Sequence, residues 1–116
     1  MDLNDCIFCK IATGVIPAGK VYEDDICLAF NDLSPQSPVH ILIIPKKHVD
    51  SLDKTKNSDG EMLGHLLLTA ADIARDKGFA ANGYRVVINT NGDGGQTVFH
   101  LHVHLLAGRP FVFPPG

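Results

Sequence analysis

Imidazole rings alternate with aliphatic side chains along His100-Leu101-His102-Val103-His104-Leu105-Leu106. Successive side chains of a β-strand point to opposite faces, so this alternation places three imidazoles on one face. The aliphatic side chains then face a core that a helix covers. Three interpretations of the imidazole face are open: an exposed strand that tolerates histidine, a three-histidine metal site, and a set of catalytic imidazoles.

A glycine-rich segment directly precedes this strand and helps to choose between the three. Gly92, Gly94 and Gly95 allow positive φ angles, and consecutive N–H groups in such a loop can bind an anion. Gln96 and Thr97 add side-chain donors beside them. A phosphate bound there would lie against imidazoles, which are neutral nucleophiles near pH 7. The combination favours catalytic imidazoles that act in nucleotidyl transfer.

The remaining segments predict an α+β domain. Residues 6–12 place apolar side chains at helical spacing, and a longer helix begins at the capping box Ser58-Asp59-Gly60-Glu61 and ends at Gly78. The apolar stripe of that helix consists of Met62, Leu63, Leu66, Leu67, Ala70, Ile73 and Ala74. Five β-prone runs are bounded by turn residues: residues 20–23, 26–30, 40–44, 84–89 and 98–106. We therefore predict one domain over residues 1–116, with a five-stranded, mainly antiparallel sheet, one long helix and a short N-terminal helix.

Composition and charge narrow the classes of partner. The 116 residues carry 10 Lys+Arg against 13 Asp+Glu, with no run of like charges, so we expect no nucleic-acid partner. The longest apolar runs, such as residues 41–44, are far shorter than the roughly 20 residues that cross a bilayer, so we expect no membrane partner. Residues 1–5 resemble no secretory leader and the cysteines number three, so we expect a cytoplasmic protein.

The histidine stretch resembles the signature of the histidine triad (HIT) superfamily, in which three histidines alternate with apolar residues. The resemblance runs along the whole chain and points to the Hint branch, which consists of dimeric purine nucleoside phosphoramidases. The matching segments are Ile16-Pro17-Ala18, Val21-Tyr22-Glu23-Asp24-Asp25, Leu28-Ala29-Phe30, Asp32, Ser34-Pro35-Gln36, His40, Ile44-Pro45-Lys46-Lys47-His48, Gly83-Tyr84-Arg85, Asn89, Asp93-Gly94-Gly95-Gln96 and Pro114-Pro115-Gly116.

This resemblance implies a catalytic role for each histidine. His102 would be the nucleophile that attacks the α-phosphorus of an adenosine or guanosine phosphoramidate, after which water releases the mononucleotide. His104 would contact the α-phosphate oxygens, while His100 and His40 would complete the catalytic set. Thr97, where the Hint pattern usually has serine, keeps the hydroxyl.

The resemblance also implies a set of nucleotide-binding residues. It further implies that catalysis needs no cofactor. Gln96, Thr97 and the Gly95 backbone would hold the phosphate and the leaving amine. Asn89 would lie beside the phosphate and ribose, and the Asp32 carboxylate can accept hydrogen bonds from two ribose hydroxyls. The apolar walls around the base would be Phe8, Ile11, Phe30 and Leu33.

A structural zinc site is a separate expectation. Cys6 and Cys9 form a Cys-x-x-Cys pair that is spaced to hold one ion, and two imidazoles would complete a tetrahedral set. Some HIT relatives carry such a pair together with two histidines, and the equivalent positions here are His48 and His100. The alternatives are two cysteines on the buried side of a helix and, less favoured, a redox pair.

Two further functions and the oligomeric state complete the expectations. A nucleotide-binding regulatory or scaffold protein with little turnover is one alternative, and a dinucleoside polyphosphate hydrolase of the Fhit branch is the other. The apolar tail at residues 111–115 and the small core predict a homodimer. Phe113 stands where the Hint pattern often has tryptophan, which bears on the choice of leaving group.

Overall fold

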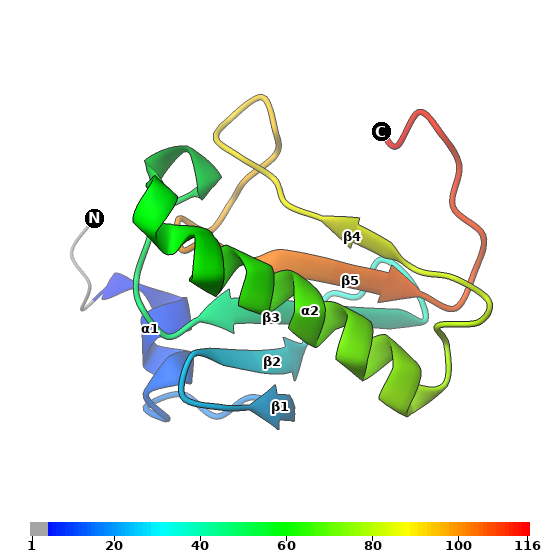
Figure 1. The fold of residues 1–116 in the computed structure, drawn as a ribbon, viewed down its shortest axis with the longest axis horizontal. Helices are drawn as coiled ribbons and strands as arrows, with labels where there is room; N and C mark the ends of the chain where they lie inside the picture. The colour runs from blue at the N-terminus through cyan, green and yellow to red at the C-terminus, as the bar shows by residue number, and fades with distance from the viewer. Residues whose placement is uncertain (1–4) are drawn as a thin grey trace.

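Five β-strands form one sheet in the order β1-β2-β3-β5-β4 in the computed structural model, which describes residues 5–116 (Figure 1). Every neighbouring pair is antiparallel. The strands are β1 Lys20–Glu23, β2 Cys27–Asn31, β3 Val39–Pro45, β4 Arg85–Val87 and β5 Val103–Ala107. The helices are α1 Ile7–Ala12 and α2 Gly60–Lys77, with short 3-10 turns at Leu52–Lys54 and Asn57–Asp59. The predicted fold class is therefore confirmed.

The sheet buries both of its faces, but under helices of different size. Alternate residues of a strand point to opposite faces, so β2 and β3 each contribute to two apolar clusters. The α2 side contains Cys27, Ala29, Ile41, Ile43, Leu101, Val103 and Leu105. The α1 side contains Leu28, Phe30, Leu42 and Ile44 together with Phe8 and Ile11. Because α1 has only 6 residues, it covers part of its face and leaves room for a cavity there.

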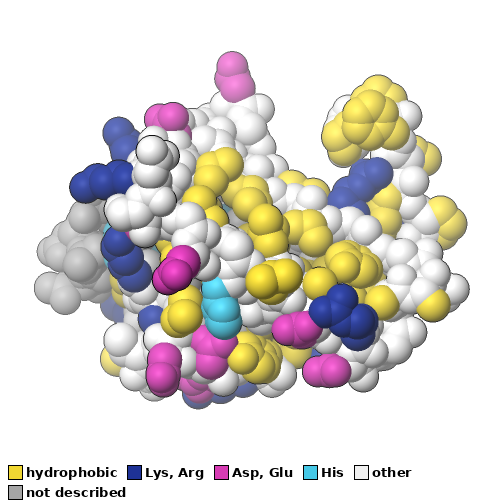
Figure 2. Space-filling model, in the orientation of Figure 1, with side chains coloured by type: hydrophobic (Ala, Val, Ile, Leu, Met, Phe, Trp, Pro, Cys, Tyr) yellow, Lys and Arg dark blue, Asp and Glu magenta, His cyan; other side chains and the backbone are white. Residues whose placement is uncertain are grey.

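The long helix packs through most of the predicted apolar stripe. Leu66 and Ala70 are fully buried, whereas Leu67 is 46% exposed and the polar Thr69 is buried in its place. The Thr69 hydroxyl lies 3.8 Å from the Cys27 sulfur of β2, so the polar group has a partner on the buried face. Figure 2 shows hydrophobic side chains along the outward side of this layer, where Leu67 and Leu68 are exposed.

The start of α2 differs from the predicted capping box. The helix begins at Gly60, and Asp59 occupies the N-cap position without a side-chain bond into the helix. The Asp59 carboxylate instead accepts the Lys56 N–H at 2.9 Å and the Lys47 ammonium at 2.8 Å. The capping interaction is thus made one turn earlier, around the 3-10 turn, because Lys47 holds the acid there.

Two strands are shorter than predicted. The run 84–89 forms a strand only at Arg85–Val87, and the run 98–106 forms one only from Val103. The ladder between β3 and β5 ends at the pair Ile43 and Val103. Before that point, the Leu101 N–H still donates to the Val49 carbonyl at 2.7 Å. The alternation of faces nevertheless continues outside the ladder, since Leu101 is buried in the α2-side core.

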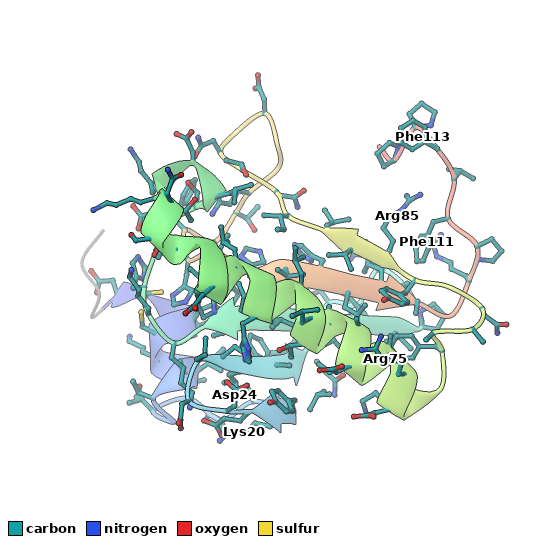
Figure 3. The ribbon with its side chains drawn as sticks, viewed as in Figure 1. Lys20, Asp24, Arg75, Arg85, Phe111 and Phe113 are labelled. Carbon is teal, nitrogen blue, oxygen red and sulfur yellow. The ribbon has the colours of Figure 1, made fainter. Side chains whose placement is uncertain are left out.

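One carboxylate fastens the β1–β2 turn to α2, and sequence reasoning missed it. Asp24 Oδ1 accepts the N–H groups of Ile26 and Cys27 at 2.8 and 2.9 Å. Asp24 Oδ2 accepts the Tyr22 hydroxyl at 2.7 Å and His65 Nε2 of α2 at 2.6 Å. Burial alone would raise the pKa of Asp24, but these four hydrogen bonds outweigh it and lower the pKa well below its usual value. Figure 3 shows Asp24 beside strands β1 and β2.

Replacing Asp24 with asparagine should destabilise the protein by about 1–3 kcal/mol, because an amide nitrogen then faces donors that the carboxylate had satisfied. The measurement is urea unfolding at pH 7, with Asp25→Asn in the same exposed turn as the control, which we expect to change stability by no more than about 0.5 kcal/mol. The carboxylate's contribution is present above the ordinary pKa of 3.8 and is lost as the pH falls below it. Equal effects of the two substitutions would contradict the role of Asp24.

Within residues 5–116, no helix is both long enough and apolar enough to span a membrane.

Candidate active site

A cavity of about 470 Å³ opens on the face of the sheet that α1 covers only in part. Its walls come from α1, from the loop before β1, from the β2–β3 loop and from the histidine segment. Nine of the residues nominated from the sequence line it: Phe8, Ile11, Phe30, Asp32, Leu33, His40, Thr97, His102 and His104. The volume and the mixture of apolar walls with a few convergent polar groups are typical of a small-molecule site.

One end of the cavity is apolar. The rings of Phe8 and Phe30 meet edge to face with centroids 5.6 Å apart, and both residues are buried. Leu33 contributes a side chain that is 98% exposed at the rim. A flat apolar group that enters here would contact the aromatic wall on one side and cover Leu33 on the other.

His102 lies next to this aromatic wall, and its ring has a defined orientation. His102 Nδ1 lies 2.8 Å from the backbone carbonyl of His100, so Nδ1 carries a proton and donates a hydrogen bond to this carbonyl. The Nε2 atom of His102 then has a free lone pair. The Phe8 ring packs edge to face on His102 at 5.2 Å and limits its rotation.

His104 has the opposite arrangement because a second histidine lies behind it. The Gln36 N–H donates to His40 Nδ1 at 3.0 Å, so the proton of neutral His40 is on Nε2. This Nε2 atom lies 2.9 Å from His104 Nδ1 and 3.4 Å from the Asp32 carboxylate. His104 Nδ1 therefore accepts, and His104 Nε2 carries a proton that it can donate.

Burial keeps this histidine pair neutral at pH 7. Desolvation lowers the pKa of His40, and it lowers that of His104 to about 4 with help from His102 and His40. The rings of His102 and His104 lie 4.9 Å apart. Two neighbouring imidazoles thus offer one lone pair and one N–H donor, which suits attack on a phosphorus atom and stabilisation of its oxygens.

The glycine-rich loop before the histidines is a tight turn. A side-chain carbon at Gly94 would lie 2.4 Å from the Thr90 carbonyl oxygen, so only glycine fits. Gly95 and Asn91 both have positive φ angles, of 82° and 59°. The loop conformation therefore depends on these residues, as the sequence suggested for the glycines.

The donors of this loop do not all face the cavity. The N–H groups of Gly95 and Gln96 donate to carbonyls within the loop, so they do not form the expected anion nest. The Gln96 side chain is 6% exposed, and its Nε2 donates to the carbonyls of Asp50 and Val98 at 2.7 and 3.1 Å. Thr97, in contrast, is exposed and lines the cavity.

Asn89 is a predicted nucleotide-binding residue that does not line the cavity. It lines a separate hollow between β4 and the C-terminal tail, together with Arg85 and Phe113. Within one chain, Asn89 therefore belongs to this hollow and not to the wall of the cavity.

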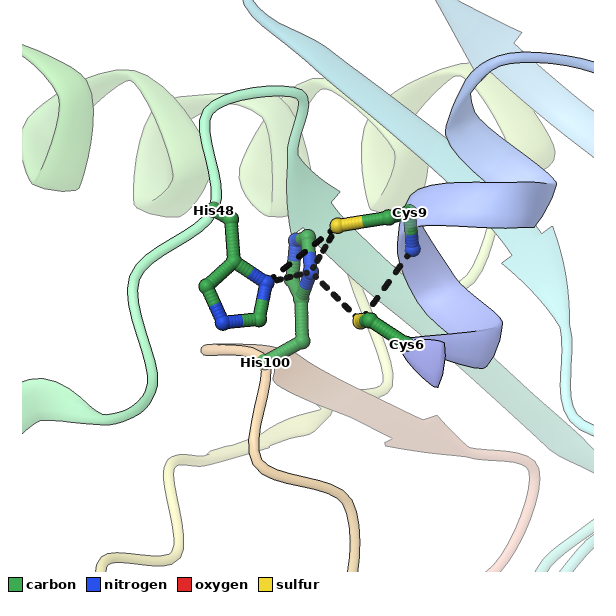
Figure 4. Close-up of side chains that lie close together, drawn as sticks. All are labelled: Cys6, Cys9, His48 and His100. Atoms are coloured by element: carbon green, nitrogen blue, oxygen red, sulfur yellow. Dashed lines mark hydrogen bonds between the residues drawn. The ribbon is translucent and has the colours of Figure 1, made fainter. Parts of the chain in front are cut away.

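The four predicted zinc ligands lie together under α1 (Figure 4). The sulfur and Nδ1 atoms of Cys6, Cys9, His48 and His100 are all within 4.8 Å of one another. His100 Nδ1 lies 3.3 Å from the Cys6 sulfur and 3.1 Å from His48 Nδ1, and the Cys9 sulfur lies 3.2 Å from His48 Nδ1. Zinc bonds of about 2.0–2.3 Å correspond to tetrahedral ligand separations of about 3.3–3.8 Å, so the donor set fits such an ion.

The outward nitrogens of both histidines are already bonded. His100 Nε2 lies 2.8 Å from the Pro45 carbonyl, and His48 Nε2 lies 2.7 Å from the Asp50 carboxylate. Because Nε2 donates in each ring, both Nδ1 lone pairs point into the cluster, as in metal-bound histidines. Burial also lowers the pKa of His100 to about 4, so this ring is a neutral ligand at pH 7.

His100 therefore has two separate contacts. Its ring faces the cysteines and is fully buried, so it does not line the cavity. Its backbone carbonyl accepts a hydrogen bond from the Nδ1–H group of His102. Of the groups that set these ring orientations, sequence reasoning missed Gln36, Pro45 and Asp50; only Asp50, an acid two residues after His48, left a signal that could have been read.

Comparison with known proteins agrees with this arrangement. The HIT domain family matches residues 13–111. An uncharacterized HIT-like protein of Synechocystis sp. is 54% identical over 113 residues, which cover 97% of this chain and 98% of that protein.

Solved structures of similar proteins have the same fold. A HIT family hydrolase from Legionella pneumophila superposes with a TM-score of 0.95 at 49% identity, covering 97% of this chain and 100% of that one. A histidine triad protein from Clostridium difficile gives a TM-score of 0.93 at 52% identity, with 97% of each chain covered. With its histidine segment, its cavity and these relatives, the chain belongs to the HIT domain family.

Proposed function

We propose that this protein is a hydrolase that cleaves the P–N bond of purine nucleoside 5′-phosphoramidates and releases a nucleoside monophosphate. The observation that carries the proposal is the pair of neighbouring imidazoles with opposite protonation, His102 with a lone pair and His104 with an N–H donor, at the polar end of a largely apolar cavity. The similarity to a HIT family hydrolase supports hydrolysis in general.

The reaction proceeds in two displacements. His102 Nε2 attacks the α-phosphorus, a phosphorus–histidine bond forms, and the P–N bond of the substrate breaks. The leaving amine takes a proton through the Thr97 hydroxyl, which lines the cavity beside the histidines. Water then attacks the phosphorus of the nucleotidyl-histidine and the phosphorus–histidine bond breaks. The proton that the water loses replaces the one that Thr97 passed to the amine, so His102 is regenerated and the nucleoside monophosphate is released.

The surrounding residues stabilise the charged intermediate. When His102 is nucleotidylated, its ring is cationic and the Nδ1–H bond to the His100 carbonyl becomes charge-assisted. His104 Nε2–H meets the negative phosphate oxygens and does so as a fixed donor, since His40 holds the other side of its ring.

The apolar end suits the purine, and Asp32 suits the ribose. Asp32 Oδ1 already accepts the Ser34 N–H at 2.7 Å, which fixes the carboxylate at the cavity wall. Each carboxylate oxygen has a second lone pair, so two ribose hydroxyls can still donate to Asp32. Phe8 and Leu33 would then lie on either side of the base.

Substituting His102 with alanine should lower kcat by about 10³-fold or more, because the covalent nucleophile is removed. AMP affinity, measured by calorimetry, should stay within a few-fold, because the apolar walls and Asp32 remain. The assay uses an adenosine phosphoramidate with a fluorescent amine, with ATP and a dinucleoside polyphosphate as competing substrates. Turnover like that of the wild type would remove His102 from this role, and preferential cleavage of the dinucleotide would favour the Fhit-type alternative.

We propose in addition that Cys6, Cys9, His48 and His100 hold a structural zinc ion that ties α1 to the histidine segment. Two thiolates and two neutral imidazoles suit zinc, and the separations of the ligand atoms fit tetrahedral coordination. The ion has no part in the displacement steps, since these ligands do not line the cavity.

Protein purified without a chelator or an affinity tag should contain about one zinc per chain by elemental analysis, and a Cys6→Ser/Cys9→Ser variant should contain none. Cys27→Ala is the matched control and should retain the metal, because Cys27 lies on the α2 side of the sheet. Metal-free protein that keeps its full stability and has freely titratable thiols at both Cys6 and Cys9 would reject the site.

We also propose that the protein is a homodimer. Strand β4 is at one edge of the sheet, and the tail that follows β5 leaves the surface beside it (Figures 1 and 3). Val112 and Phe113 are 76% and 87% exposed, although the Arg85 guanidinium holds the Val112 carbonyl at 2.7 Å. An ordered apolar tail that projects in this way is suited to a second copy of the chain.

Light scattering at micromolar concentration should give twice the chain mass of 12.5 kDa. A Val112→Ser/Phe113→Ser variant should shift towards 12.5 kDa, because the tail then buries no apolar surface. Val15→Ser, which alters an exposed valine far from the tail in sequence, should remain dimeric. A monomeric wild type would contradict this proposal.

A further inference from the structure

The segment from His48 to Asp50 contacts both the cysteine–histidine cluster and the glycine-rich loop. The Asp50 carboxylate lies 2.7 Å from His48 Nε2. The backbone carbonyl of the same residue accepts the Gln96 side-chain amide, also at 2.7 Å. Asp50 is therefore the point at which the cluster and the loop before the catalytic histidines meet.

On the cluster side, the carboxylate determines how His48 is presented. A carboxylate can only accept here, so His48 Nε2 carries the proton and Nδ1 keeps its lone pair. Figure 4 shows this Nδ1 atom directed at Cys9 and His100. A carboxylate behind a metal-binding imidazole typically raises metal affinity by 10- to 100-fold.

On the loop side, Gln96 closes the turn and connects it to Asp50. The side-chain Oε1 of Gln96 accepts the backbone N–H of Asn91 at 2.9 Å. The backbone N–H of Gln96 donates to the Asn91 carbonyl at 3.0 Å. Its Nε2 reaches Asp50 from a buried position. The Gln96 side chain therefore connects the loop directly to the residue whose carboxylate contacts the cluster.

We propose that Asp50 is a positioning residue that couples metal binding to the order of the loop at residues 90–96. The carboxylate holds His48 ready for the ion, and an ion on His48 in turn fixes the carbonyl that anchors Gln96. The inference rests on the zinc site proposed above and extends it to the loop that leads into Thr97 and the cavity.

Val49, in the middle of the segment, provides a rigid connection between the two contacts. Val49 is buried in the α2-side core, and its carbonyl accepts the Leu101 N–H at 2.7 Å. A segment of three residues that is held in the core leaves little freedom between His48 and the Asp50 carbonyl. Coupling of this kind is reciprocal, so an ordered loop should also favour the ion.

The experiment measures zinc affinity by competition with a chromophoric chelator, and loop order by hydrogen exchange of the Asn91 and Gln96 amides. In the wild type, zinc should slow exchange of both amides at least about 5-fold. Asp50→Ala should bind zinc about 10- to 100-fold more weakly and, at saturating zinc, show a smaller slowing. Asp50→Asn keeps an acceptor oxygen and should recover most of both effects.

Asp53→Ala is the matched control, because it removes the same charge from an exposed site in the next turn and should behave as the wild type. Exchange rates that do not respond to zinc in the wild type would overturn the proposal. Zinc affinity equal in Asp50→Ala and Asp53→Ala, or no zinc binding in the wild type, would also overturn it. None of these readouts uses a nucleotide, so an inactive protein that shows them fails only the proposed hydrolysis.

Discussion

The structure depends on the strict alternation of side chains along residues 100–105. Leu101, Val103 and Leu105 are each at most 1% exposed in the α2-side core, so their register against the sheet cannot slip. A shift by one residue would place imidazoles in that core and leucines in the cavity. The free energy of burying three aliphatic side chains, about 1.5–3 kcal/mol each, therefore also fixes where the histidine rings lie.

Given that register, backbone groups assign the chemistry of each ring. His102 and His104 are neighbours on one face, yet a carbonyl behind the first and a histidine behind the second give them opposite protonation. Both contacts come from inside the protein, so neither requires a ligand to form. For the proposed reaction the site is preorganised, because the lone pair of His102 and the N–H donor of His104 are in place without a substrate.

The spacing of apolar residues in the sequence predicted those elements whose formation depends on neighbouring residues. The alternation along the histidine segment and the period near 3.6 in α2 are local patterns, and β2 and β3 are continuous apolar runs because both faces of the sheet are buried, so the sheet and the long helix were predictable. The Asp24 network, the inward turn of Gln96 and the late start of β5 at Val103 were not, because each depends on a partner that is distant in sequence. A glutamine beside a glycine-rich turn suggests a side chain that donates to a ligand. The structure shows that the Gln96 amide instead donates a hydrogen bond to the Asp50 carbonyl.

The separation between the cavity and the tail constrains how a leaving group is selected. Phe113 and Asn89 line a hollow of their own, and neither lines the cavity that contains His102. In the single chain, the leaving group would therefore meet Thr97 and solvent, with few contacts that select one amine from another. On the dimer proposal, selectivity can come from the second copy, because an exposed tail is free to reach a neighbour's cavity. On that proposal, Phe113 would act on substrate choice between subunits, while the proposed P–N cleavage would stay within one chain.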